Sequence, residues 1–549
     1  MPDLPVNNQA LGQDPPKTGE DSLNQNPPAP PVESPKVNEV VEPKDPSAPV
    51  GNFSTPPGST PPASPEALKT EESLPSPSLP PLPVQDKPGV VDPGVVAGVG
   101  GGVPTAEPQT FHSAGRSPGS VIKKIVPLLI ILVVAAGIVY AVSRYFLPQV
   151  SEIGFGKKEL VYWGLWESEG VMETVLSEWE EESGVKVLYE YHHPREYRQR
   201  LQTALAKGEG PDIFRFHNSW TPMLKNDLDA VPASVMNAAT FENTYYPVAQ
   251  ASLKSGAGYL GIPLEIDTLA LFYNQDIFTA ARVSPPRTWD ELRRLAIQLT
   301  VRDGQSKQIQ RAGVSLGTTG NIWHWSDILG LMMLQNGAKL NNPTGPLAED
   351  ALSFYALFSK TDKVWDETLP DSLTAFAMEK SAMCFGYSWS IFEILNVNPN
   401  LNFKVIPVPQ LSETDITWAS FWVEGVSKNS PNKTAAWDFL KFLSSEETME
   451  KLYQSQSKVR LFGEPYSRVS MASKLEDDPM VFPFISQASK AESWYLSSRT
   501  FDNGINDSII EYFADAVNSV SQRSSAKGAL STVAKGVRQI LSKYGLPLK

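Results

Sequence analysis

Cysteine is almost absent from the sequence. The single one among 549 residues is Cys384, which lies inside the apolar phrase SAMCFGY. An intramolecular disulfide, a cysteine-based zinc site and a lipid-bearing cysteine ahead of a folded domain are therefore excluded. We interpret Cys384 as a small buried hydrophobic residue.

Motifs for nucleotide, metal and nucleic-acid binding are also missing. Without a glycine-rich phosphate loop, no nucleotide cofactor is expected. His192 and His193 would point to opposite faces of a strand, and no H-E-x-x-H motif is present, so we interpret them as surface residues and expect no metal. The formal net charge is −14, and no basic stripe with interleaved aromatic residues occurs, which argues against nucleic-acid binding.

One long apolar run, IVPLLIILVVAAGIVYAVSRYFL, extends from Ile125 to Leu147. About 20 apolar residues at ~1.5 Å rise span the ~30 Å hydrocarbon core of a bilayer. We predict one transmembrane helix over residues 121–147 and a short linker over 148–157. A cleaved secretory signal would lie at the extreme N-terminus, whereas residues 1–120 precede this run.

Residues 1–120 are rich in proline, as in PPAPPVESPK, and carry more acidic than basic side chains. A segment of this composition has too little apolar surface to offset the entropy of ordering the chain. We therefore predict a disordered, acidic tail. The phrase Pro80-Pro81-Leu82-Pro83 fits an aromatic groove of a partner, and the alternative is a solvated spacer.

The remaining residues, about 158–549, are more than one core usually holds and therefore predict two lobes. β-rich runs at Glu159–Trp163, Val185–Tyr191 and Ile213–Phe216 alternate with helical spacing at Glu169–Ser183 and Arg195–Lys207. This alternation is typical of a doubly wound α/β sheet, in which ligands bind beyond the carboxyl ends of the strands.

Six phrases in this part carry a family resemblance. They are VYWGLWES, GEGPDIFRFHNSW, GIPLEIDTLALFYNQDIF, PPRTWDEL, FAMEKSAMCFGYSWS and VEGVSKNSPNKTAAWDFLKFLSSEE, in this order. Together they resemble the extracellular solute-binding proteins of ABC transporters, in the sugar and oligosaccharide branch that includes maltose-binding protein. The resemblance covers nearly all of residues 157–549, while the tail and the apolar run have no counterpart in that family's usual layout.

The resemblance implies a two-lobed, periplasmic-binding-protein-like α/β fold with discontinuous lobes. Lobe one would comprise about 158–265 and 411–460, including a helix at Lys433–Leu443. Lobe two would comprise about 269–405 and 465–549, and the chain would first cross between the lobes near Glu265–Thr268. A monomer is expected, with solute bound in the cleft between the lobes and delivered to the transporter permease.

A sugar site needs flat aromatic rings for C–H faces, together with carboxylates and amides for hydroxyl groups. The expected cleft loops supply ten candidates: Trp166, Glu167, Asn218, Trp220, Glu265, Asp267, Trp323, Trp325, Trp389 and Trp422.

Several tryptophans have a structural alternative. Trp163, Trp179, Trp289 and Trp437 lie within strands or on helical faces and are assigned to the core. Of Trp323 and Trp325, one is expected in the cleft and the other in the core, and Trp422 fits either place. The resemblance implies that Trp389 stacks on the sugar.

Asp267 lies at the expected lobe crossing, where the resemblance implies a sugar-contacting carboxylate. Strand alternation points Glu265 to the same side as Asp267. The alternative for one of them is a hinge role, in which the carboxylate accepts hydrogen bonds from backbone N–H groups.

We therefore predict a solute-binding protein without catalytic residues. A glycoside hydrolase would also need two carboxyl groups at a suitable separation, but the resemblance is to a non-catalytic family. The other alternative is a sensor or scaffold that uses the proline-rich tail inside the cell. Basic residues on the two sides of the apolar run nearly balance, so function sets the orientation: the binding domain outside the cell and the tail in the cytoplasm.

Overall fold

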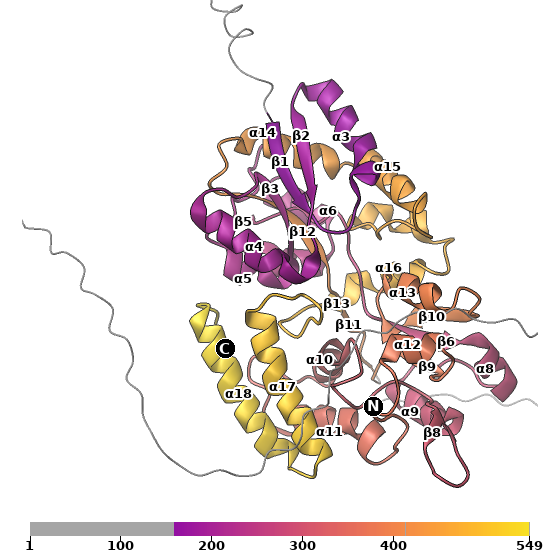
Figure 1. The fold of residues 1–549 in the computed structure, drawn as a ribbon. Coiled ribbons are helices and arrows are strands. Elements are labelled where there is room, and N and C mark those ends of the chain that lie inside the picture. The colour runs from indigo at the N-terminus through magenta and orange to yellow at the C-terminus, as the bar shows by residue number, and fades with distance from the viewer. Residues whose placement is uncertain (1–158, 412, 548–549) are drawn as a thin grey trace, which may run out of the picture. The chain divides into compact units, whose positions relative to one another are not determined.

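The computed structural model describes residues 159–411 and 413–547 (Figure 1). The predicted tail over residues 1–120, the predicted transmembrane helix over 121–147 and the predicted linker over 148–157 lie outside these ranges. Within them, no helix combines the length and the apolar composition that a membrane span requires.

The first lobe is built on a four-stranded sheet with the strand order β12-β3-β1-β2. β1 (Glu159–Gly164) pairs in parallel with β2 (Lys186–Tyr191) and with β3 (Ile213–His217). β12 (Trp422–Val426) comes from much later in the chain and pairs antiparallel with β3. The three strands predicted from the β-rich runs are confirmed, with small shifts at their ends.

Two helices connect these strands, and both were predicted. α3 (Glu169–Ser183) has the predicted bounds, and α4 (Pro194–Lys207) begins with a proline, whose missing N–H costs nothing at the first helical position. Each helix ends at a glycine in the left-handed region, Gly184 at φ 70° and Gly208 at φ 73°, which glycine adopts without strain.

The chain returns to the first lobe in two further helices. α14 (Lys433–Leu443) contacts β12 and α3, and α15 (Glu446–Ser457) packs against α3. α14 has the predicted bounds, and its Trp437 is buried in the core, where its indole N–H donates to Asp229 over 2.9 Å.

The second lobe contains a three-stranded antiparallel sheet with the order β10-β6-β9. Its strands are β6 (Ala270–Asn274), β9 (Met383–Gly386) and β10 (Phe403–Pro407). Every residue of β6 is buried, because side chains leave the strand toward apolar clusters on both faces. Cys384 of β9 is fully buried, as predicted.

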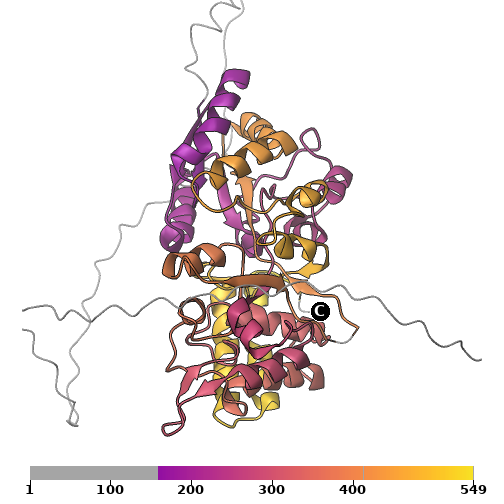
Figure 2. The same ribbon diagram turned by 90° about the vertical axis from the view of Figure 1, so that its right-hand side faces the viewer.

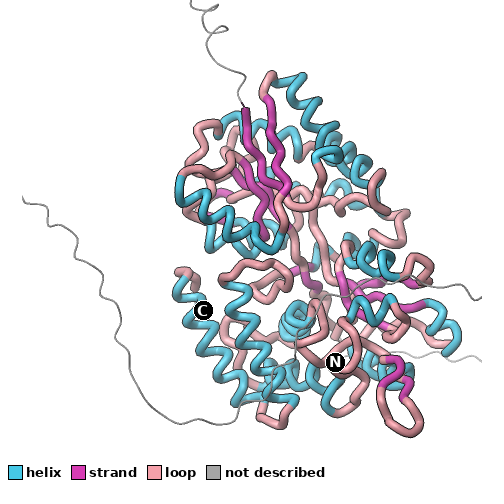
Figure 3. Tube along the Cα trace, viewed as in Figure 1, coloured by secondary structure: helices cyan, strands magenta, loops and turns pink. Residues whose placement is uncertain are grey.

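Helices flank both main sheets (Figure 3). In the second lobe, α17 (Ile505–Ser521) packs along α18 (Ala526–Lys543), and both contact α11 (Pro346–Lys360). The other helices of eight or more residues are α9 (Trp289–Leu299), α10 (Trp325–Gln335) and α13 (Ser390–Val397). Shorter helices are α5 (Thr221–Leu224), α6 (Ala238–Thr244), α7 (Pro247–Leu253), α8 (Gln275–Ala281), α12 (Ser372–Ala377) and α16 (Phe482–Ser486). Short strand pairs are β4 (Lys254–Ser255) with β5 (Gly258–Tyr259), and β7 (Val301–Arg302) with β8 (Ile309–Arg311).

The segments that run between the lobes lie side by side. Bridges pair Glu265 with Tyr466 and Thr268 with Ala419. β11 (Thr417–Trp418) pairs with β13 (Ala491–Glu492). Figure 2 shows these connections between the two halves of the folded part. The predicted crossing near 265–268 lies among them, and the lobe limits derived from the sequence stay a prediction.

Candidate functional site

A cavity of about 340 Å³ lies between the lobes and is lined by residues of both; we call it the cleft cavity. Trp166 reaches it from the loop after β1, and Trp422 is the first residue of β12. Trp389 lines the opposite wall, directly before α13. The cavity therefore lies where ligands bind in such sheets, beyond the carboxyl end of a parallel strand.

The aromatic walls of the cleft cavity are supported by neighbouring rings. Trp166 meets Trp422 edge to face, with ring centroids 5.1 Å apart. Trp389 stacks on Tyr387 with centroids 4.4 Å apart and an angle of 13° between the planes. Rings held in this way offer rigid flat surfaces to a ligand. Three more aromatic residues complete the lining: Phe392, Phe462 and Phe501.

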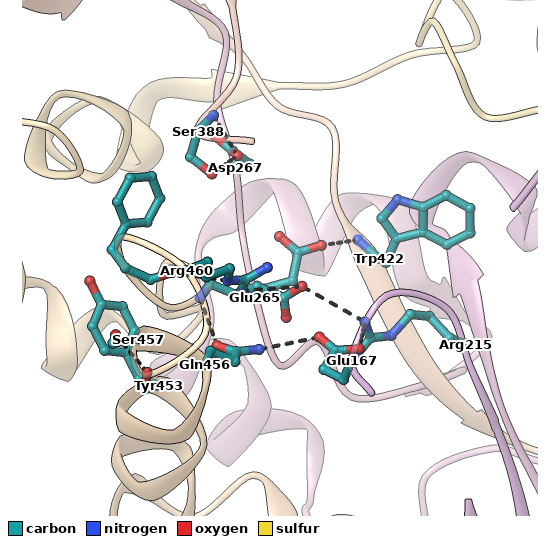
Figure 4. Close-up of polar contacts among 12 residues, drawn as sticks. Glu167, Arg215, Glu265, Asp267, Ser388, Trp422, Tyr453, Gln456, Ser457 and Arg460 are labelled. Carbon is teal, nitrogen blue, oxygen red and sulfur yellow. Dashed lines mark hydrogen bonds and ion pairs between the residues drawn. The ribbon is translucent and has the colours of Figure 1, made fainter. Parts of the chain in front are cut away.

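Asp267 lines the cleft cavity from the crossing segment and is almost completely buried. Its Oδ2 accepts hydrogen bonds from the Ser388 backbone N–H, at 2.9 Å, and from the Ser388 hydroxyl (Figure 4). Its Oδ1 has no hydrogen-bond partner among the described residues. Burial raises the pKa of Asp267 to about 8, because the charged form loses its hydration.

Glu265 also lines the cleft cavity, on the same side of the crossing segment as Asp267, as the alternation predicted. Its Oε1 accepts the Trp422 backbone N–H at 2.6 Å. Burial, and secondarily the nearby Glu464, raise the pKa of Glu265 well above its usual value. Both carboxyl groups thus bind a backbone N–H, which is the hinge contact considered as the alternative, and both also face the cavity.

Behind the cavity, Arg215 of β3 is buried among acidic side chains. Its guanidinium is 2.9 Å from Glu167 and 2.6 Å from Glu424, and it lies 3.8 Å from Glu464. Gln456 also donates to Glu167, over 3.2 Å (Figure 4). Burial alone would raise the pKa of Glu167, but Arg215 and further polar partners hold it below its usual value. Glu167, a predicted ligand residue, is thus placed in this ion-pair network and not in the lining of the cleft cavity.

Asn218 and Trp220 follow β3, as predicted, but they do not line the cleft cavity. The Asn218 amide donates to Ser252, over 3.1 Å, and to Ser493, over 3.0 Å. It lies beside a separate cavity of about 750 Å³, which we call the Asn218 cavity. Trp220 is completely buried and packs against Trp422 with ring centroids 5.1 Å apart, so it supports the cavity wall from behind.

Trp323 and Trp325 were expected to divide between cleft and core. Trp325 is buried in the core of the second lobe. Trp323 remains 38% exposed outside the cleft cavity, where its indole N–H donates to Asp371 over 2.6 Å and Arg499 lies over its ring. Neither ring lines the cleft cavity, so the expectation that one of the two lies in the cleft has no support there.

The four tryptophans assigned to the core are all buried: Trp163, Trp179, Trp289 and Trp437. The interpretation of His192 as a surface residue is wrong. Its ring packs on Trp163 with centroids 4.2 Å apart, because the residue lies just past the end of β2 and turns inward. Among residues 159–411 and 413–547, no group of three histidine, cysteine or acidic side chains is arranged to hold a metal ion.

Sequence reasoning missed a group of cavity residues that lie far along the chain. They come from the loop after α15 and from the segment before α17: Arg460, Phe462, Glu464, Arg499 and Phe501. These loops show neither helical nor strand periodicity, and their local turn signals are the glycine and proline at 463 and 465 and the Asn503-Gly504 pair. His217, at the end of β3, also lines the cavity, and burial lowers its pKa to about 3, which keeps it neutral.

Comparison with known proteins places this geometry in a family. The family model for bacterial extracellular solute-binding proteins matches residues 174–459. Maltotriose-binding protein of Pyrococcus abyssi is 20% identical over 300 residues, which cover 52% of this chain and 61% of that protein. Diacetylchitobiose binding protein DasA of Streptomyces coelicolor is 21% identical over 289 residues, which cover 50% of this chain and 65% of that protein. The chain thus spans less than two thirds of the length of these curated relatives.

Solved structures share the fold. An ABC transporter solute-binding protein from Thermotoga lettingae, bound to α-D-tagatose, superposes with a TM-score of 0.55 at 22% identity. The match covers 70% of this chain and all of that one. The two-lobed α/β fold predicted for the C-terminal part is thereby confirmed, and the matched family consists of solute-binding proteins and not of enzymes. This chain belongs to the family of bacterial extracellular solute-binding proteins.

Proposed function

We propose that the folded part of the chain binds a sugar or oligosaccharide reversibly in the cleft cavity. The observation that carries the proposal is the pairing of supported tryptophan rings with buried carboxyl groups in one cavity between two lobes. Flat rings suit the C–H faces of sugars, and carboxyl oxygens suit their hydroxyl groups. The maltotriose, diacetylchitobiose and tagatose named for similar proteins support the same class of ligand.

The bound solute would be delivered to the permease of an ABC transporter. Because the cleft cavity has walls from both lobes, a ligand that contacts both lobes favours the closed arrangement. The permease would then recognise the closed, solute-bound form.

Residues 125–147 would anchor the protein in the cytoplasmic membrane. The chain has no cysteine before the folded part that could carry a lipid, so the apolar run is the candidate anchor. The extracellular location in the family's description supports a binding domain on the outer face, which would leave the proline-rich tail in the cytoplasm.

Thermal unfolding of the full chain in detergent, with and without mono- and oligosaccharides, tests the proposed binding. A ligand at ~100 times its Kd adds about 2.7 kcal/mol to the free energy of unfolding. The Trp389→Ala variant should lose most of that stabilisation, whereas Phe354→Ala on α11, outside the cleft cavity, should keep it. The proposal fails if another class of solute raises the melting temperature and no sugar does.

A further inference from the structure

The cleft cavity contains more acidic than basic side chains. Four carboxyl groups line it, against two guanidinium groups from Arg460 and Arg499. Arg499 is engaged by Glu393 in a two-pronged ion pair with distances of 3.0 and 2.8 Å. Arg460 therefore remains as the counter-charge on the cavity wall for Glu265, Asp267 and Glu464, and it lies 4.0 Å from Glu464.

Arg215, the positive charge behind the wall of the cleft cavity, is shared among several carboxyl groups. Arg215 already binds Glu167 and Glu424 at ion-pair distance, and its separation from Glu464 is the longest of the three. If all three carboxyl groups were ionised, one guanidinium among them would leave net negative charge, which costs free energy in a region of low dielectric.

Asp267 provides a separate observation that points to a ligand. Its side chain is almost completely buried, faces the cleft cavity, and has one oxygen without a hydrogen-bond partner among the described residues. A buried acceptor of this kind normally has a donor, so a ligand is expected to supply one.

We propose that the ligand is an amino sugar whose positively charged amino group is held by Asp267, Glu265 and Glu464 in the cleft cavity. This inference rests on the proposed sugar binding and specifies the class of sugar. The ammonium group would donate to the Asp267 carboxyl and supply the positive charge that lets these carboxyl groups ionise. The tryptophan and phenylalanine rings around the carboxyl groups also favour a cation, through attraction to their faces.

The protonation of these carboxyl groups agrees with this proposal. Burial raises the pKa of Asp267 and of Glu464 to about 8, so both hold a proton near neutral pH. Glu167, Arg215 and Arg460 act on Glu464, and Arg215 also acts on Glu265; the two arginines lower these pKa values. In addition to burial, the charge of Asp267 raises the pKa of Tyr387, and His217, Glu393 and Arg499 line the same cavity. An ammonium ligand would replace these protons, whereas a neutral sugar would leave them in place.

The pH dependence follows with a definite sign. A carboxyl group with a raised pKa in the folded state makes unfolding easier as pH rises from the ordinary pKa of about 4 toward 8. Binding an ammonium group releases protons from the site, so its affinity should rise with pH as long as the amine stays charged. A neutral sugar should show little of this dependence.

Three disaccharides with the same β-1,4-linked glucose skeleton isolate the amino group. They are the β-1,4-linked disaccharide of glucosamine with free amines, the same disaccharide with both amines N-acetylated, and cellobiose. We expect calorimetric titration of the full chain in detergent at about pH 6.5 to show the free amine binding about tenfold more tightly, or better, than both neutral sugars. Between about pH 5.5 and 7, its affinity should increase.

Two variants assign this preference to the site. Asp267→Asn should remove most of the advantage of the free amine, and Glu464→Gln should reduce it independently, with thermal unfolding showing that each variant is folded. Asp515→Asn on the exposed side of α17 makes the same chemical change outside the cavity and should leave the preference intact.

The outcomes separate the two proposals. If the neutral disaccharides bind as tightly as the free amine, the amino-sugar inference is overturned while sugar binding stands. Spermidine, a linear polyamine, serves as a second source of ammonium groups, and binding of spermidine without any sugar would overturn the inference. Binding of no sugar at all, in this set or in the wider thermal screen, would remove both proposals.

Discussion

Arg215 is the residue on which the buried charges of the first lobe depend. It lies on the central part of the sheet with a side chain only 2% exposed, and it neutralises Glu167 and Glu424 directly. The backbone carbonyl of Arg215 also accepts a hydrogen bond from the Tyr197 hydroxyl, over 2.6 Å. A buried pair of this kind adds little over a well-packed apolar alternative, but removing one partner leaves the others charged and without compensation.

Replacement of Arg215 by methionine should therefore lower the free energy of unfolding by about 3–5 kcal/mol, measured by urea denaturation. Lys186→Met in the same sheet is the control, because the Lys186–Glu159 pair has side chains 47% and 44% exposed. Its loss should cost about 0–1 kcal/mol. Equal effects of the two substitutions would show that the network around Arg215 is not a buried one.

Helices and strands near the start of the folded part were predictable from local pattern. α3 has the predicted bounds because its apolar residues recur at helical spacing and because a glycine ends the run, whereas the bounds of α14 were implied by the family resemblance. The antiparallel pairing of β12 with β3 and the antiparallel second sheet were not predictable in this way, since they join segments far apart in the sequence.

Part of the candidate site was also predictable from the sequence. Five predicted residues line the cleft cavity. Trp166 and Trp389 follow strand ends, Glu265 and Asp267 lie at the crossing, and Trp422 begins β12. The positions of the other site residues depend on contacts between segments that are far apart in the sequence.

Glu167 turns to Arg215, and Trp220 and Trp325 enter the cores. Arg460 and Glu464 reach the cavity only because α15 packs on α3 and ends beside the crossing segments.

At the scale of the whole molecule, the proposed arrangement has the folded part outside the cell and the tail inside. Protease treatment of intact cells that produce the full chain tests it. The folded part should be accessible to protease at unfolded or exposed loops, while an epitope placed within residues 1–120 should persist until the membrane is permeabilised. Loss of the epitope from intact cells, with the folded part protected, would reverse the proposed orientation.

Sugar binding in the cleft cavity is the central proposal for this protein. A crystal structure of the protein with the sugar that gives the largest thermal stabilisation is the most direct measurement. We expect the sugar in the cleft cavity, against Trp389 and the Trp166–Trp422 pair, with a donor group at the Oδ1 of Asp267. A sugar bound in the Asn218 cavity, or at any place that leaves Asp267 and Trp389 without contact, would contradict it.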